Sequence, residues 1–88
     1  MSLHVLAYIT NWCPDCSRSR RVLQRSGVLF DEVDIDNVEG AEAVMRAANG
    51  GSGKVPTVII ARDDERVVLI EPGDRELAEA LRKMQTSS

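Results

Sequence analysis

Apolar and polar residues alternate along the chain in a pattern that divides it into seven elements. Four runs rich in apolar and β-branched residues are typical of strands, at positions 3–10, 28–35, 56–61 and 66–70. Three other segments carry helix start signals or apolar residues at helical spacing, and they predict helices at about 14–27, 38–48 and 74–85. The order strand–helix–strand–helix–strand–strand–helix predicts an α/β fold with one four-stranded mixed sheet and helices on both faces.

Individual residues mark the ends of the first and last helices. Pro14 suits the first helical position, where its missing N–H has no partner to lose, and Gly27 is a plausible stop. Asp74 is predicted to cap the last helix. The apolar residues of that helix that should face inward are Leu77, Leu81 and Met84.

The middle helix is predicted from one apolar face and from the acidic residues before it. Asp36 or Asn37 can cap it, and Glu39 completes a capping box if Asp36 is the cap. The loop "NGGSG" at 49–53 should end it. The predicted inward face consists of Val38, Ala41, Val44 and Ala48.

The connections between the strands predict the layout of the sheet. The first strand–helix–strand unit should be a right-handed parallel crossover. Three acidic residues in the run 28–35 suit an edge strand, where charge discourages pairing with other chains: Asp31, Glu32 and Asp34. The last two strands, joined through "RDDE" at 62–65, should form a hairpin covered by the last helix.

Composition narrows the class of protein. With 88 residues, 43% of them hydrophobic and 28% charged, the chain predicts a single globular domain over 1–88, with an ordered core at about 3–84 and a frayed tail at 86–88. No apolar run is long enough to span a membrane, and the N-terminus lacks the basic segment of a secretory signal. A net charge of −3 gives no electrostatic reason to bind nucleic acid. We therefore expect a cytoplasmic monomer that binds neither nucleic acid nor membrane.

The two cysteines, Cys13 and Cys16, are candidates for metal binding, for a structural disulfide or for redox chemistry. A disulfide between them closes a very small loop and so stabilises the fold little. A structural zinc needs four ligands, and the chain offers only these cysteines and His4, at the far end of the first strand. A metal would therefore require a dimer or an added small thiol, and no metal ligands are assigned.

The position of Cys13, between a strand and the start of a helix, favours the redox role. The free N–H groups of the first turn and the positive end of the helix dipole both favour thiolate over thiol there. Cys16, almost one turn further on, should be more buried and act as the resolving sulfur. Asp15 should oppose ionisation of Cys13. Three basic residues either support ionisation or bind an acidic ligand, or are simply solvated: Arg18, Arg20 and Arg21.

Four motifs make the sequence resemble the glutaredoxin branch of the thioredoxin superfamily, and mycoredoxins within it. They are "WCPDC" (12–16), "VDID" (33–36), "VPTVII" (55–60) and "EPGDREL" (71–77). The resemblance implies a thioredoxin-like fold and a cis bond between Val55 and Pro56, which presents the backbone of Val55 to the substrate. From the residues alone, Pro56 would only begin an edge strand.

Residues near the active sulfur are candidates for holding the substrate, some from their own chemistry and some from the resemblance. Pro14 stiffens the first turn, and Trp12 either shields the sulfur and offers a flat contact or is a partly buried hydrophobe. Lys54 lies in a flexible "GGSGK" loop, which does not fit a phosphate-binding loop, and it can reach a ligand carboxylate. Gly73 and Asp74 correspond to the place where relatives hold the γ-glutamyl end of glutathione. The chain lacks the Pro-Tyr pair and the Gly-Gly turn of many glutathione-binding members.

Together these features predict a dithiol oxidoreductase. It would reduce protein disulfides, or mixed disulfides between proteins and mycothiol, bacillithiol or glutathione, without a tightly bound cofactor and with a low-molecular-weight thiol as co-substrate. Electrons would come from that thiol or from a flavin disulfide reductase. The alternatives are a redoxin reduced by thioredoxin reductase that serves ribonucleotide reductase, a dimeric metal or iron–sulfur carrier, and a binding module that has lost activity.

Overall fold

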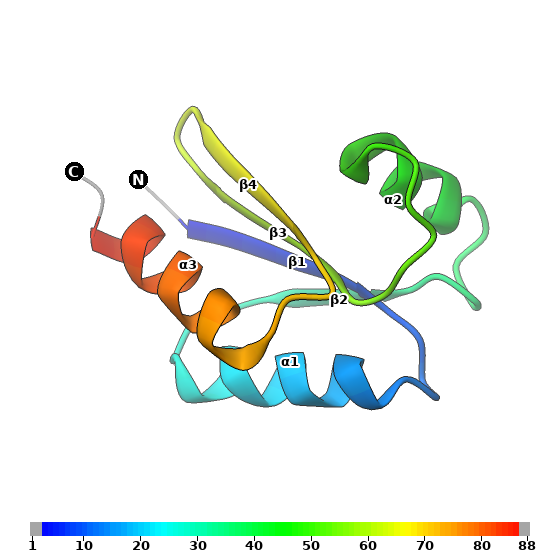
Figure 1. Ribbon diagram of the computed structural model, residues 1–88. Helices are drawn as coiled ribbons and strands as arrows, with labels where there is room; N and C mark the ends of the chain where they lie inside the picture. Colours follow the sequence, from blue (N-terminus) through cyan, green and yellow to red (C-terminus); the bar gives the residue numbers. More distant parts are fainter. Residues whose placement is uncertain (1–2, 87–88) are drawn as a thin grey trace.

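Residues 3–86, the part that the computed structural model describes, form four strands and three helices in the predicted order (Figure 1). The strands are β1 (Leu3–Ile9), β2 (Asp31–Asp34), β3 (Thr57–Arg62) and β4 (Glu65–Ile70). The helices are α1 (Pro14–Arg25), α2 (Ala41–Asn49) and α3 (Asp74–Thr86). Of the tail predicted to fray, Ser87 and Ser88 lie outside the described residues.

The four strands form one mixed sheet in the order β2-β1-β3-β4. β1 runs parallel to β2 and antiparallel to β3, and β3 and β4 form the antiparallel hairpin that was predicted. Figure 1 shows α1 and α3 on one face of the sheet and α2 on the other. The predicted α/β fold, with helices on both faces, is confirmed, and the acidic strand β2 lies at an edge as expected.

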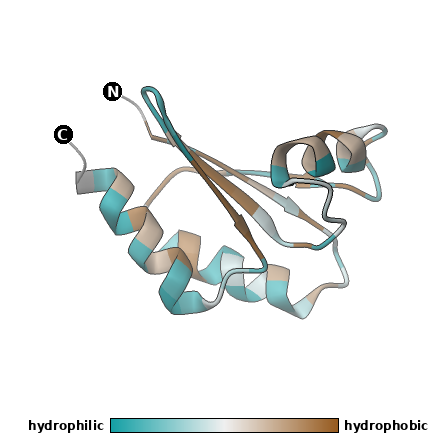
Figure 2. Ribbon diagram, turned by 45° about the horizontal axis from the view of Figure 1, so that its top comes forward, coloured by the Kyte–Doolittle hydropathy of each residue, from teal (hydrophilic) through white to brown (hydrophobic). Residues whose placement is uncertain are grey.

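The core lies between the sheet and the pair α1 and α3. Figure 2 shows apolar residues gathered along the central strands, while the tip of the hairpin is hydrophilic. Removing this apolar surface from water is the main force that holds the helices against the sheet. The residues that fill the core come from alternate positions of β1 and β3 and from one face of each helix: Val5, Ala7, Ile9, Val58, Ile60, Val22, Leu23, Leu77, Leu81 and Met84. The inward face predicted for α3 is therefore confirmed.

The middle helix begins later than the sequence predicted. Asp34 organises the preceding turn, because its carboxylate accepts hydrogen bonds from the amide of Asp36 at 2.9 Å and from the side chain of Asn37 at 2.7 Å. Asp36 and Asn37 are thus committed to the turn, and the predicted capping box is wrong. The N-cap is Gly40, whose φ of 81° is one that glycine adopts without steric cost.

The predicted inward face of α2 is partly wrong as well. Ala41 is buried as expected, but the other anchor is Met45, while Val38 and Val44 are exposed. Ala41 and Met45, four residues apart, share the buried face of the helix, and Val38 lies before the helix begins. At the last helix, Asp74 is the first helical residue rather than the cap. The amide of Leu77 donates to the carbonyl of Gly73 at 3.0 Å, so Gly73 holds the capping position.

Truncation of a core leucine should destabilise the fold strongly. Leu23 on α1 is 0% exposed, so Leu23→Ala leaves a cavity and should lower the free energy of unfolding by about 3 kcal/mol. Leu29, which is 90% exposed, is the matched control, and Leu29→Ala should change it by less than about 0.5 kcal/mol. Urea unfolding of the reduced proteins measures both. Equal losses in the two variants would contradict the assignment of the core.

Candidate active site

Cys13 lies where the chain leaves β1 and enters α1. It is the N-cap residue of this helix of 12 residues, in an extended conformation with φ −92° and ψ 115°, and Pro14 follows as the first helical residue. The backbone amide of Cys16 donates to Cys13 Sγ at 3.3 Å. The sulfur therefore occupies the place of a capping oxygen, where a negative charge is stabilised by the first-turn amides and the helix dipole.

The charged residues near the sulfur on α1 largely pair with one another. Asp15 forms an ion pair with Arg18, which reduces the repulsion that Asp15 was expected to exert on a thiolate. Arg20 instead reaches across to β2, where its Nε donates to Glu32 at 2.7 Å. Two of the three basic residues named from the sequence, Arg18 and Arg20, are thus engaged by carboxylates.

Cys16 is the more deeply buried of the two free thiols, as predicted. It is 1% exposed, against 7% for Cys13. Burial raises the pKa of Cys16 to about 12, and its side-chain hydrogen bond with Cys13 acts in the same direction. The backbone of Thr10 partly offsets this rise. Below that pKa, Cys16 is present mainly as a thiol.

Val55 and Pro56 face the sulfur from the start of β3. The bond between them is cis, as the resemblance implied. The Cys13 thiol donates to the carbonyl of Val55 at 3.8 Å, although the two residues are 42 positions apart in the sequence. The backbone of Val55 therefore lies next to the position that any partner bonded to this sulfur would occupy.

The segment that joins β4 to α3 lies directly beyond Pro56. The amide of Glu71 donates to the carbonyl of Pro56 at 2.8 Å, and Lys54 Nζ lies 3.6 Å from Glu71 Oε1. Gly73 and Asp74 follow at the start of α3. The structure thus brings Lys54 and the start of α3 to the same edge of the sheet as Cys13. The sequence showed Glu71 only as the first residue of the "EPGDREL" motif, with no role of its own.

Trp12 projects into solvent beside the cysteines. It is 72% exposed, so the interpretation as a partly buried hydrophobe is wrong. Its indole Nε1 donates to Asp36 Oδ2 at 3.0 Å. Asp36 was expected only as a helix cap, and a contact across 24 positions has no signal in the local sequence. An oriented, exposed indole offers a flat apolar contact close to the sulfur.

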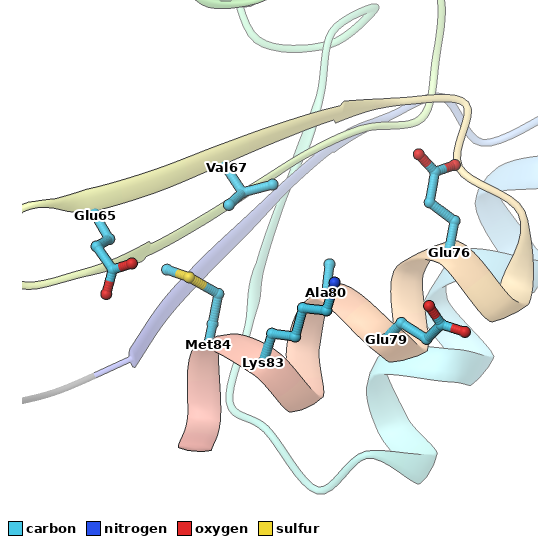
Figure 3. A pocket seen from close by; sticks show the side chains of 7 residues that line it. All are labelled: Glu65, Val67, Glu76, Glu79, Ala80, Lys83 and Met84. Carbon is cyan, nitrogen blue, oxygen red and sulfur yellow. The ribbon is translucent and has the colours of Figure 1, made fainter. Parts of the chain in front are cut away.

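Other features of the described residues lie away from the cysteines. Between β4 and α3 is a hollow of about 440 Å³, with Val67, Ala80 and Met84 among its lining residues and neither cysteine (Figure 3).

Among residues 3–86, no cluster of three or more His, Cys, Asp or Glu side chains could hold a metal ion. No helix in the same range is both long and apolar enough to cross a membrane.

Comparison with known proteins gives a consistent group of relatives. A family model described as Glutaredoxin matches residues 5–68. A glutaredoxin of Pseudomonas aeruginosa is 41% identical over 56 residues, which cover 64% of this chain and 66% of that protein. Mycoredoxin 1 of Corynebacterium glutamicum is 36% identical over 55 residues, covering 62% of this chain and 67% of that protein. This chain therefore aligns with about two thirds of the length of each.

A solved structure supports the fold independently of sequence. Thioredoxin O2 from Arabidopsis thaliana, in its oxidised state, superimposes with a TM-score of 0.72 at 18% identity, covering 94% of this chain and 75% of that chain. At this identity the likeness concerns the fold alone. It agrees with the thioredoxin-like fold that the resemblance implied.

Proposed function

Because the chain belongs to the glutaredoxin family of thiol–disulfide oxidoreductases, we propose that it reduces mixed disulfides between proteins and a low-molecular-weight thiol, with Cys13 as the attacking sulfur. The observation that carries this proposal is the position of Cys13 Sγ at the helix N-cap, 3.3 Å from the amide of Cys16. That position stabilises the thiolate, which is the nucleophile in disulfide exchange.

The first step transfers one thiol group to the protein. The Cys13 thiolate attacks one sulfur of the substrate disulfide, a new S–S bond forms to Cys13, and the old S–S bond breaks. The departing sulfur keeps the electron pair of the broken bond and takes a proton from water. If the small thiol is the group transferred, the substrate protein leaves fully reduced.

The second step frees Cys13 by one of two routes. A second molecule of the small thiol, as thiolate, attacks the sulfur of the transferred group, so that a small-thiol disulfide leaves and Cys13 becomes a thiolate again. Alternatively Cys16 loses its proton and attacks Cys13 Sγ, which forms the Cys13–Cys16 disulfide and releases the transferred group. Two further thiols then reduce that disulfide. Because the pKa of Cys16 is raised to about 12, the first route should dominate near neutral pH.

Residues around the sulfur would hold the substrate. The Val55 backbone, next to cis-Pro56, is suited to pair with the chain on either side of a substrate cysteine. Trp12 offers an exposed aromatic contact, and Pro14 stiffens the first turn. Lys54, Gly73 and Asp74 form the polar end of the same region and would contact the small thiol. The small thiol is a co-substrate, and the proposal requires no tightly bound cofactor.

The proposed partners are S-thiolated or disulfide-bonded proteins and a small thiol, which is mycothiol, bacillithiol or glutathione. A flavin disulfide reductase is the proposed source of electrons. A monomer in the reducing cytoplasm suits this role, because two thiols on one chain complete the reaction.

Turnover with defined reductants tests the proposal. A test protein carrying each thiol in turn as a mixed disulfide is offered with that thiol and its reductase, or with thioredoxin reductase alone. Turnover that depends on the small thiol is expected. Turnover driven only by thioredoxin reductase would replace the proposal with the redoxin alternative, and no turnover with any pair would reject both.

A further inference from the structure

Beside the catalytic region Lys54 forms an ion pair with Glu71, a residue to which the proposed reaction gives no role. Three contacts connect this ion pair to Cys13. Cys13 Sγ faces the carbonyl of Val55 at 3.8 Å, the next carbonyl, of Pro56, accepts from the amide of Glu71 at 2.8 Å, and the Glu71 carboxylate lies 3.6 Å from Lys54 Nζ. The ion pair is therefore formed by residues that adjoin Val55 and Pro56, the segment that faces Cys13.

Glu71 occupies a backbone conformation that its residue type disfavours. Its φ is 48°, in the left-handed region where glycine or asparagine is normally found. Such a conformation is costly for glutamate and tends to occur at functional sites. The side chain it positions is thus a candidate for a role, since glycine would allow the same turn without a carboxylate.

The surroundings of Glu71 are acidic on balance. Asp74 and Glu76 lie in the first turn of α3, and Figure 3 shows the carboxylate of Glu76 pointing towards the segment that joins β4 to α3. Arg75 lies in the same turn, but Lys54 is the cation that the Glu71 carboxylate pairs with. A ligand carboxylate arriving here would have to compete with Glu71 for Lys54 and would be repelled by it.

We propose that Glu71 is a specificity-determining residue: by occupying Lys54, it selects low-molecular-weight thiols whose groups near this edge are neutral hydroxyls and amides, and disfavours thiols that carry carboxylates there. This inference rests on the proposed function. It assigns to Glu71 no part in the chemistry of the sulfurs.

A matched pair of substrates isolates the effect of the carboxylate charges on the small thiol. The same test protein is converted to its mixed disulfide with glutathione and, separately, with glutathione diethyl ester, which has the same skeleton without the carboxylate charges. Reduced protein is mixed with each adduct, and release of the test protein thiol gives two second-order rate constants. The quantity compared is the ratio of the glutathione rate to the ester rate.

Glu71→Gln should raise this ratio about 3- to 10-fold, the size expected for removing one partly solvated charge within several ångströms of another. The added Lys54→Met change should cancel most of that gain, because the gain comes from freeing Lys54. The increase should also shrink at high salt, since added ions screen the interaction.

Glu65→Gln is the matched control. It removes the same charge at the other end of β4, roughly 20 Å from Glu71 by strand length, where ions at ordinary salt screen most of the interaction. It should leave the ratio unchanged. Glu71→Asn, which tolerates a positive φ, repeats the test if the glutamine variant folds poorly.

The outcomes separate the two proposals. If the wild type reacts with the ester adduct and the ratio does not change in either Glu71 variant, the specificity role is wrong and the proposed function stands. If the wild type reacts with neither adduct faster than free cysteine does, the proposed function fails and the inference fails with it.

Discussion

Cys13→Ser is expected to abolish thiol exchange, with a loss of about 1,000-fold or more in the rate of reduction of a mixed disulfide. A serine hydroxyl is not ionised near neutral pH and forms no disulfide, so the first step has no nucleophile. The helix end that stabilises Cys13 Sγ, through the amide of Cys16 at 3.3 Å, cannot compensate for this. The measurement is turnover of an S-thiolated test protein with excess small thiol.

Cys16→Ser is the matched control, because it makes the same atomic change at the neighbouring sulfur. It should retain much of the turnover with mixed disulfides, since the small thiol can free Cys13 without Cys16. With a protein disulfide as substrate, it should instead accumulate a covalent complex through Cys13, visible by mass spectrometry. If both serine variants are equally inactive towards mixed disulfides, the route through a single thiol is wrong.

The second large effect is a steep pH dependence of the resolving step. Cys16 attacks only as thiolate, and burial raises its pKa to about 12. Below this pKa the thiolate fraction grows tenfold with each pH unit, so the rate of attack on Cys13 Sγ should rise roughly 1,000-fold from about pH 6 to about pH 9. Burial is the largest cause of the raised pKa of Cys16, and it persists after Cys13 has bonded to a substrate. The smaller increase that comes from the hydrogen bond with the Cys13 thiol is then lost.

A chromogenic aromatic disulfide, mixed rapidly with one equivalent of reduced protein, separates the two steps. The first release of chromophore reports attack by Cys13, and the second reports displacement by Cys16. Only the second phase should accelerate strongly with pH, and Cys16→Ser should lack it. A second phase that is equally fast across this pH range would contradict the raised pKa.

The parts of the structure that the sequence predicted are those set by local signals. Pro14 at the first helical position and the apolar strand before it were enough to place Cys13 at a helix N-terminus. The inward stripe Leu77, Leu81 and Met84 likewise follows from spacing alone. The cis bond before Pro56 was implied by resemblance, because its cause lies in contacts that the local sequence does not reveal.

The parts that the sequence did not predict depend on contacts between distant positions. Asp34 lies on the edge strand as expected but also organises the next turn, and Asp36, expected as a helix cap, instead accepts a hydrogen bond from Trp12. The pair of Lys54 and Glu71 exists only because β3 and β4 align Thr57 with Ile70, which brings the residues that flank them together. No local pattern predicts such a register.

The central claim is that Cys13, at the start of α1, is a more reactive nucleophile than an ordinary cysteine near neutral pH, and alkylation tests it most directly. In Cys16→Ser, Cys13 is the sole thiol, so the rate of its reaction with iodoacetamide at about pH 6 to 7 reports the thiolate at that position. The account predicts alkylation at least about tenfold faster than that of free cysteine under the same conditions. A rate no greater than that of free cysteine would contradict it.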